Sequence, residues 1–123
     1  MVKFNAFRHF VNTYVDKHYK IDEGKIKISK SDGYKHNIRV CEICCKLIQE
    51  KNIKFITQCR LKGGSIPDVV FFRGNIPYIV EVRNTENDRR SKKKLEKLPY
   101  ELREFVVYID ANKPLNKEIS KIR

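Results

Sequence analysis

Two apolar segments joined by a three-residue link constrain the fold of this chain more than any other feature. Residues 67–72 and 76–83 are apolar on both faces, and Arg73-Gly74-Asn75 between them is a tight-turn signal. Because so short a link joins antiparallel neighbours, we expect a β-hairpin. Strands that are apolar on both faces are typical of the middle of a sheet, so the hairpin should be central.

The spacing of the remaining apolar residues predicts the other elements. A period near 3.6 indicates helices, and apolar runs between turn signals indicate strands. Helices are predicted at residues 3–19, 35–51 and 86–98, strands at 25–28, 53–59 and 105–109, turns at 31–33 and 62–65, and either a short helix or a loose tail from residue 112. This order predicts an α/β fold with a central mixed sheet flanked by helices. Residues 35–123 would form the core domain and residues 1–34 an N-terminal helical extension packed on it, in one compact domain overall.

The helix at 35–51 has the clearest pattern. Its predicted buried stripe contains Ile38, Cys41, Cys45 and Ile48, with Cys44 beside it. Glu42 lies about 100° from the centre of that stripe, so it can reach from the rim into a shared cleft. The run of cysteines contains no turn residue, and we interpret these cysteines and Cys59 as core residues rather than as metal ligands.

The charge of the chain favours a polyanionic partner. Lys and Arg number 27 and Asp and Glu number 15, which gives a net charge of +12. We place nucleic acid ahead of a membrane, because no run approaches the roughly 18 apolar residues of a spanning helix. The N-terminus has no apolar segment like that of a signal peptide, so we expect an intracellular protein with reduced cysteines.

Two acidic residues and an arginine interrupt the apolar hairpin. Glu81 and Arg83 lie two residues apart and point to the same face, and Asp68 lies at a similar distance from the turn as Glu81. Two carboxylates that face each other repel unless a cation lies between them. Phosphodiester hydrolysis needs such a cation, because it activates water and neutralises developing charge. In the alternative, Asp68 caps a turn, and Glu81 and Arg83 pair with each other or with a nearby lysine.

The residues Pro67-Asp68, a spacing of 13 residues, and Glu81-Val82-Arg83 resemble the motif of the PD-(D/E)XK nuclease superfamily. Within it the chain is most similar to small archaeal Holliday junction resolvases and related archaeal or viral nucleases. The resemblance covers residues 35–110 and implies a restriction endonuclease-like αβββαβ core. It also implies Mg²⁺ or Mn²⁺ held by Asp68 and Glu81, with Glu42 as a further ligand. Arg83 stands where the family usually has lysine, and an arginine cannot act as a general base.

The expected DNA contacts are basic residues on both sides of the hairpin. They are Arg60 and Lys62 before it and Arg89, Arg90, Lys92, Lys93, Lys94 and Lys97 after it, with Gln58, Asn84 and Thr85 as polar neighbours. These bases can bind phosphates without reading sequence, although any one lysine is equally consistent with a solvated surface. Of the three histidines, His9, His18 and His36, we expect surface roles, although His36 begins the core helix and could approach the site.

Three hypotheses follow from these patterns. The first is a metal-dependent endonuclease that cuts branched or duplex DNA, structure-selectively or nonspecifically, as a homodimer. In it Phe4, Phe7 and Phe10 serve as interface or core residues, with no membrane partner and no small-molecule cofactor. The second is a DNA-binding protein that keeps the nuclease fold and has lost turnover through Arg83. The third is a basic RNA-binding or ribosome-associated module without an active site.

Overall fold

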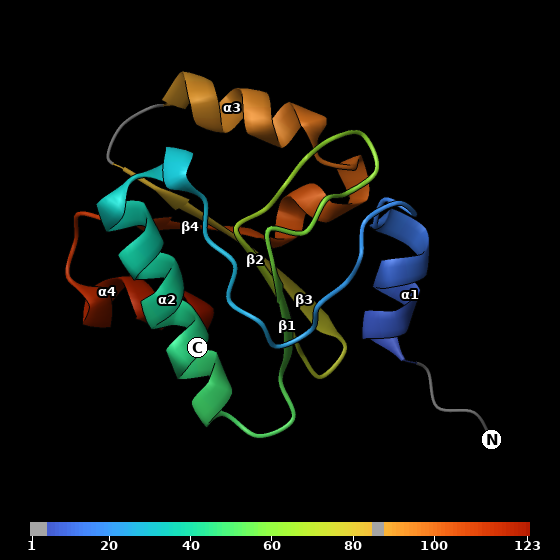
Figure 1. Cartoon of the computed structure of the whole chain (residues 1–123), viewed down its shortest axis with the longest axis horizontal. Helices are drawn as coiled ribbons and strands as arrows, with labels where there is room; N and C mark the ends of the chain where they lie inside the picture. Colours follow the sequence, from blue (N-terminus) through green and yellow to red (C-terminus); the bar gives the residue numbers. More distant parts are fainter. Residues whose placement is uncertain (1–4, 85–87) are drawn as a thin grey trace.

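A four-stranded mixed sheet forms the centre of the computed structural model, which describes residues 5–84 and 88–123, including their side chains except those of residues 88–92 (Figure 1). Its strands are β1 (Lys54–Thr57), β2 (Val69–Arg73), β3 (Ile76–Arg83) and β4 (Val106–Asp110), in the order β1-β2-β3-β4. Strands β1 and β2 are antiparallel, as are β2 and β3, whereas β3 and β4 are parallel. The predicted central hairpin is therefore confirmed.

Helices cover both faces of the sheet. They are α1 (Ala6–Tyr14), α2 (Tyr34–Gln49), α3 (Asp88–Lys97) and α4 (Leu115–Ile119), with short 3-10 segments η1 (Lys30–Asp32), η2 (Tyr100–Phe105) and η3 (Ser120–Ile122). Figure 1 shows α2 and α4 on one side of the sheet and α1 on the other. The chain is thus mixed α/β, as the periodicity predicted, and no helix among the described residues is long and apolar enough to cross a membrane.

Alternation along the hairpin divides the core between the two faces. Val69 and Phe71 pack with α2, α4 and η3, whereas Val70 and Phe72 pack with α1 and η2. Each fully buried large apolar side chain contributes about 1.5–3 kcal/mol, so both layers stabilise the sheet. The acidic residues Asp68 and Glu81 share the parity of Val70 and Ile79 and lie at the end of the second face.

The N-terminal segment differs from its prediction at two places. Helix α1 ends at Tyr14, because Val15 leaves the helix and pairs with Leu61 in an isolated bridge. Residues 25–28 form no ladder and are irregular. There the Thr57 side chain accepts a hydrogen bond from the Lys27 amide at 2.8 Å and donates one to the Lys25 carbonyl at 2.7 Å, in place of a strand pairing.

Helix α2 lies where it was predicted, but its buried face is different. The core side contains His36, Val40, Ile43, Cys44 and Leu47. The predicted stripe of Ile38, Cys45 and Ile48 is exposed, and Cys41 is half-buried. Both stripes are apolar, and only the position of the sheet decides between them. The core interpretation is confirmed for Cys44 and Cys59 and is wrong for Cys45.

The C-terminal residues are a packed element rather than a loose tail. Ile119 and Ile122 are buried in the core beneath α2. The Arg73 guanidinium donates a hydrogen bond to the Ile122 carbonyl at 2.6 Å and also pairs with Glu50. These contacts hold the chain end to the outer end of the hairpin, opposite the acidic residues.

Candidate active site

The register of the hairpin brings Asp68 and Glu81 together. Val69 pairs with Val80, so the preceding Asp68 lies across from the following Glu81. Both are buried, with 4% and 9% of their surface exposed. The Asp68 Oδ2 atom accepts a hydrogen bond of 2.8 Å from the Val82 amide, which fixes this carboxylate against β3. Two ionisable acids thus share one buried end of the sheet.

The pKa of the Glu81 carboxyl is strongly raised. Burial, and then the charge of Asp68, raise its pKa from 4.5 to about 8, although Lys94 acts in the opposite direction. The Lys94 Nζ atom forms an ion pair with Glu81 Oε2 at 3.6 Å, which is longer than a hydrogen bond. The lysine pairing that the alternative expected for Glu81 is therefore present. This buried oxygen has no hydrogen-bond partner within the described part of the chain. A buried carboxylate oxygen without a hydrogen bond is energetically unfavourable unless a proton or a cation neutralises it.

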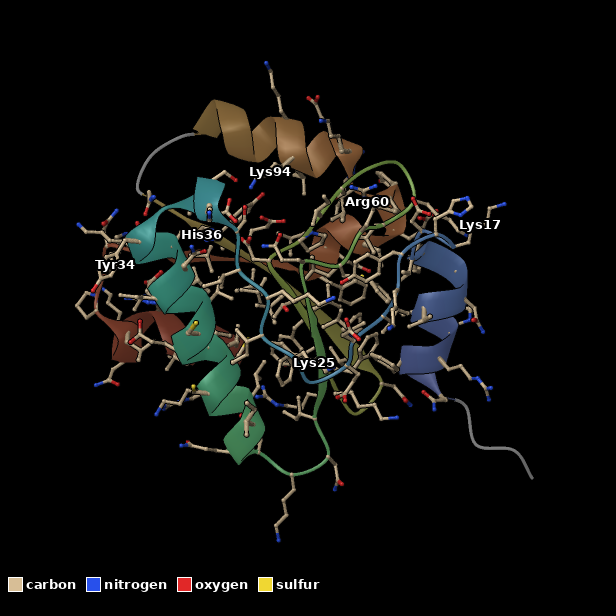
Figure 2. The ribbon with its side chains drawn as sticks, in the orientation of Figure 1. Lys17, Lys25, Tyr34, His36, Arg60 and Lys94 are labelled. Carbon is tan, nitrogen blue, oxygen red and sulfur yellow. The ribbon has the colours of Figure 1, made fainter. Side chains whose placement is uncertain are left out.

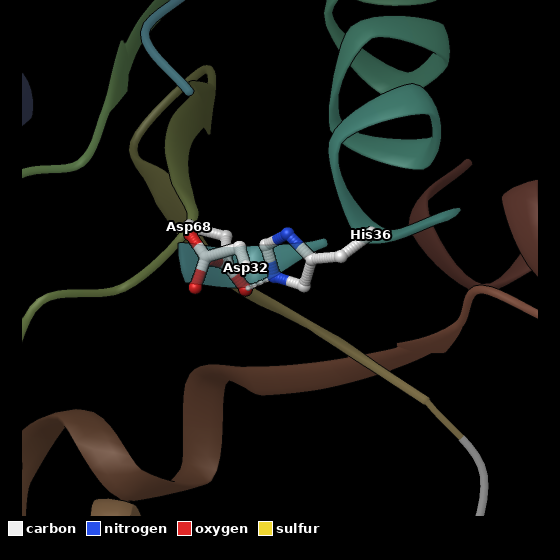
Figure 3. A group of neighbouring side chains, drawn as sticks. All are labelled: Asp32, His36 and Asp68. Atoms are coloured by element: carbon white, nitrogen blue, oxygen red, sulfur yellow. Dashed lines mark ion pairs between the residues drawn. The ribbon is translucent and has the colours of Figure 1, made fainter. Parts of the chain in front are cut away.

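His36 and Asp32 extend this acidic cluster (Figure 3). The His36 Nε2 atom lies 3.1 Å from Asp68 Oδ2, and both side chains are almost fully buried. Burial alone lowers the pKa of the imidazole, but the hydrogen bond and charge of Asp68 and the charge of Asp32 outweigh it, so the pKa is raised. One ligand atom from each of the three residues lies within 4.8 Å of the others.

The surface role expected for His36 is therefore wrong, because its side chain is buried against Asp68. A sequence signal for this was present: His36, Val40, Ile43 and Leu47 follow the i, i+4, i+7, i+11 spacing of one helical face. Asp32 had no comparable signal. It reaches the site because Gly33, with a φ of +83°, turns the chain between η1 and α2.

These groups line a polar cavity of about 370 Å³, here called the site cavity. Its lining is formed by Ser29, Ser31, Asp32, Gln58, Gly64, Ser65, Ile66, Asp68, Glu81, Lys94 and Lys97. Figure 2 shows Lys94 on the side of α3 that faces the sheet and His36 near the start of α2. The cavity thus has carboxylates at its base and two lysines at its rim.

The glycine turn and Gln58 shape one wall of the site cavity. Gln58 follows β1 with a φ of +52°, a conformation that a residue with a side chain seldom adopts. Its backbone N–H donates a hydrogen bond to the backbone carbonyl of Asp68 at 3.2 Å. Gly63 has a φ of +92°, and a Cβ there would lie 3.3 Å from the Lys97 carbonyl. The turn therefore approaches the end of α3 closely, and both this approach and the positive φ favour glycine.

Two of the expected site residues do not line the site cavity among the described residues. The Arg83 guanidinium lies 4.6 Å from the centre of the Tyr108 ring. It is not among the described residues that line the site cavity. Glu42 pairs with Arg39 at 3.2 Å and lines an apolar groove on the outer face of α2. The structure therefore brings Lys94, rather than Arg83, beside Glu81, and His36, rather than Glu42, beside Asp68.

The expected DNA contacts are distributed around this cavity. Arg60, with Lys20 and His18, lines a neighbouring cavity of about 340 Å³, which shares Gln58 and Ile66 with the site cavity. Lys62, Lys93, Lys94, Lys97 and Asn84 are all exposed. Thr85 and the side chains of Arg89, Arg90 and Lys92 lie outside the described residues, as does Phe4, whereas Phe7 and Phe10 pack against the sheet.

Comparisons with protein-family models, with curated proteins and with solved structures return no match. The support for a function therefore comes from the cavity itself. Carboxylate oxygens with one imidazole nitrogen are ligands for a divalent cation. Lysines at the rim favour an anionic substrate.

Proposed function

We propose that this protein is a metal-dependent DNA endonuclease of the PD-(D/E)XK type. One observation carries the proposal: two buried acids face each other across the hairpin, and the Glu81 Oε2 atom lacks a hydrogen-bond partner among the described residues. The order α2, β1, β2, β3, α3, β4 agrees with the αβββαβ core that the Pro67-Asp68 and Glu81-Val82-Arg83 motif implies. The likeness supports a restriction endonuclease-like fold.

Asp68 and Glu81 are the residues that would hold Mg²⁺ or Mn²⁺. They fit such an ion because both are oxygen ligands, both are buried, and their mutual repulsion is relieved by positive charge. A bound divalent cation supplies an activated water and neutralises charge on the phosphate. Lys94 and Lys97 face the same cavity and would orient a phosphate above the carboxylates.

DNA is the proposed substrate, with cleavage that is structure-selective or nonspecific. The net charge of +12 and the exposed bases near the site cavity support binding to phosphates. Holliday junction cleavage and a homodimeric state stay predictions from the resemblance. A non-catalytic DNA-binding protein is the second candidate. It is favoured because Arg83 packs over Tyr108 and forms no ion pair with either acid among the described residues.

The test compares the parent protein with an Asp68→Asn variant on plasmid, single-stranded and four-way-junction DNA and on RNA, with Mg²⁺ or Mn²⁺. We expect cleavage of DNA by the parent and a loss of at least about 100-fold in the variant, since even groups that only support metal ligands contribute 10–100-fold. Asp22→Asn is the matched control, because Asp22 pairs with Lys27 at the surface and should leave cleavage unchanged.

Other outcomes separate the three hypotheses. Binding of DNA without cleavage by either protein would favour the non-catalytic candidate. Tighter binding to RNA than to every DNA form would favour the RNA-binding module. Equal cleavage by the parent and by Asp68→Asn would show that the activity arises elsewhere.

A further inference from the structure

We propose that Asp32, His36 and Asp68 form a second cation subsite, which takes a divalent ion of the first transition series, such as Mn²⁺, in preference to Mg²⁺. The subsite would share Asp68 with the Asp68 and Glu81 pair. Its role in cleavage rests on the proposed function, but its occupancy can be measured without any cleavage.

The spacing of the three side chains supports the subsite. Their ligand atoms all lie within 4.8 Å of one another. His36 Nε2 and Asp68 Oδ2 are 3.1 Å apart (Figure 3). An octahedral ion with bonds of about 2.1 Å has neighbouring ligands about 3 Å apart and opposite ligands about 4.2 Å apart. The three groups therefore already lie close to the separations that one ion requires.

An independent observation points to a cation in the same place. Glu81 is 9% exposed and lines the site cavity with Asp32 and Asp68. Its Oε2 atom has no hydrogen-bond partner among the described residues, and its nearest cation, the exposed Lys94 ammonium, lies 3.6 Å away. Asp68 is grouped with Asp32 and His36 and also lies across the hairpin from Glu81. Three carboxylates thus gather at one cavity in a chain that is otherwise strongly basic. A carboxylate shared by two ions is a usual way to join paired metals about 3.5–4 Å apart.

The imidazole determines which ion the subsite prefers. Carboxylates alone suit Mg²⁺, whereas a nitrogen ligand favours transition-metal ions, whose affinities exceed that of Mg²⁺ at mixed nitrogen and oxygen sites. The chain supplies this nitrogen from the first turn of α2, and η1, at the end of the N-terminal extension, supplies Asp32. Residues 1–34 would therefore contribute a metal ligand in addition to packing on the sheet.

The experiment measures Mn²⁺ binding to the whole chain without DNA, by titration calorimetry and by electron paramagnetic resonance. We expect two ions per parent chain and one per chain in both His36→Asn and Asp32→Asn. We also expect the preference for Mn²⁺ over Mg²⁺ to fall at least tenfold in His36→Asn. His9→Asn is the matched control, because His9 is exposed on α1 and is not among the described residues that line the site cavity. Asp32→Asn keeps the test valid if His36→Asn fails to fold.

The results distinguish the subsite from the proposed nuclease. One ion per parent chain, or two ions in both variants, would overturn the subsite even if DNA is cleaved. Two ions in the parent and one in each variant would support the subsite even if no nucleic acid is cleaved. Glu81→Gln should lose the other ion and retain the preference for Mn²⁺, which would assign the two subsites to their separate residues.

Discussion

The Glu81 carboxyl holds its proton far more tightly in the folded chain than an exposed glutamate does. Burial and the nearby Asp68 charge raise its pKa from 4.5 to about 8. The folded state therefore binds a proton that the unfolded state releases within this pH range. By linkage, the stability that this protonation provides is fully present below pH 4.5 and is lost as the pH rises through about 8. A cation between the acids would replace the proton.

Glu81→Gln should remove this pH dependence. In metal-free buffer, the free energy of unfolding of the parent should fall between pH 4.5 and about 8 more steeply than that of the variant. The difference in slope is at most about 1.4 kcal/mol per pH unit for one group. Urea unfolding at several pH values measures it, with Glu50→Gln as an exposed control. Parallel curves for the parent and Glu81→Gln would contradict the raised pKa.

Lys94 should contribute to cleavage more than its neighbour Lys93. Its ammonium lies 3.6 Å from Glu81 Oε2 and lines the site cavity, whereas Lys93 is exposed and is not among the described lining residues. We expect Lys94→Ala to lower kcat by roughly tenfold or more, or about 1.4 kcal/mol, with little change in KM. Lys93→Ala should alter kcat less than about threefold.

Steady-state cleavage assays measure both variants, and DNA binding in Ca²⁺ supplies a second measurement that should change equally in the two. Equal losses of kcat would mean that Lys94 acts only through its charge at the surface. Arg83→Lys tests the cationic side chain at position 83, where the resembled family usually has lysine. A gain in cleavage would show that Arg83, which packs over Tyr108, limits turnover.

At the level of elements, α2 shows how two apolar stripes compete for one core. The stripe that faces the sheet carries Val40, Ile43 and Leu47 together with His36, so the same rotation of the helix that buries these apolar residues aims the imidazole at Asp68. The opposite rotation would have buried Ile38 and Ile48 and would have turned Glu42 toward the cavity. The packing of one helix thus decides which residue is available to a metal.

A pair of adjacent substitutions tests this rotation. Leu47 is 1% exposed and Ile48 is 59% exposed, although both are apolar residues of α2. Leu47→Ala should lower the free energy of unfolding by about 2–5 kcal/mol, because it leaves a cavity in the core. Ile48→Ala should change it by less than about 0.5 kcal/mol. Chemical denaturation of the metal-free chain measures both, and a larger loss for Ile48→Ala would place the helix in the other rotation.

In the molecule as a whole, an acidic cavity lies within a basic protein. The net charge is +12, yet Asp32, Asp68 and Glu81 meet at one end of the sheet. Lys94 and Lys97 stand at the rim, and Arg60 lines the adjoining cavity. This arrangement would attract a polyanion over long range, and we propose that the acidic cavity binds a cation at short range. The apolar groove on the outer face of α2 is a separate feature, and its residues take no part in the site.

Part of the site followed from the sequence alone. A three-residue link and the two-residue period of strands place Asp68 across from Glu81, because both properties are local and leave one register for the hairpin. The acids were predicted for this reason, and the central position of β2 and β3 was predicted because both strands are apolar on both faces. The basic character of α3 was also predicted from the sequence. The sequence did not predict which of its lysines faces the acids.

Only the tertiary structure decided the rest. His36, Asp32 and Lys94 come from separate elements, and each reaches the cavity through the rotation of a helix or the path of a loop. Arg83 has the same parity as Glu81, and its guanidinium packs over the ring of Tyr108, which pairs with Glu81 on the parallel neighbour β4. Local spacing determines which residues share a face. Which face is buried depends on the apolar surfaces of other elements that pack against it. These elements are distant in sequence, so the pattern within one segment does not reveal the buried face.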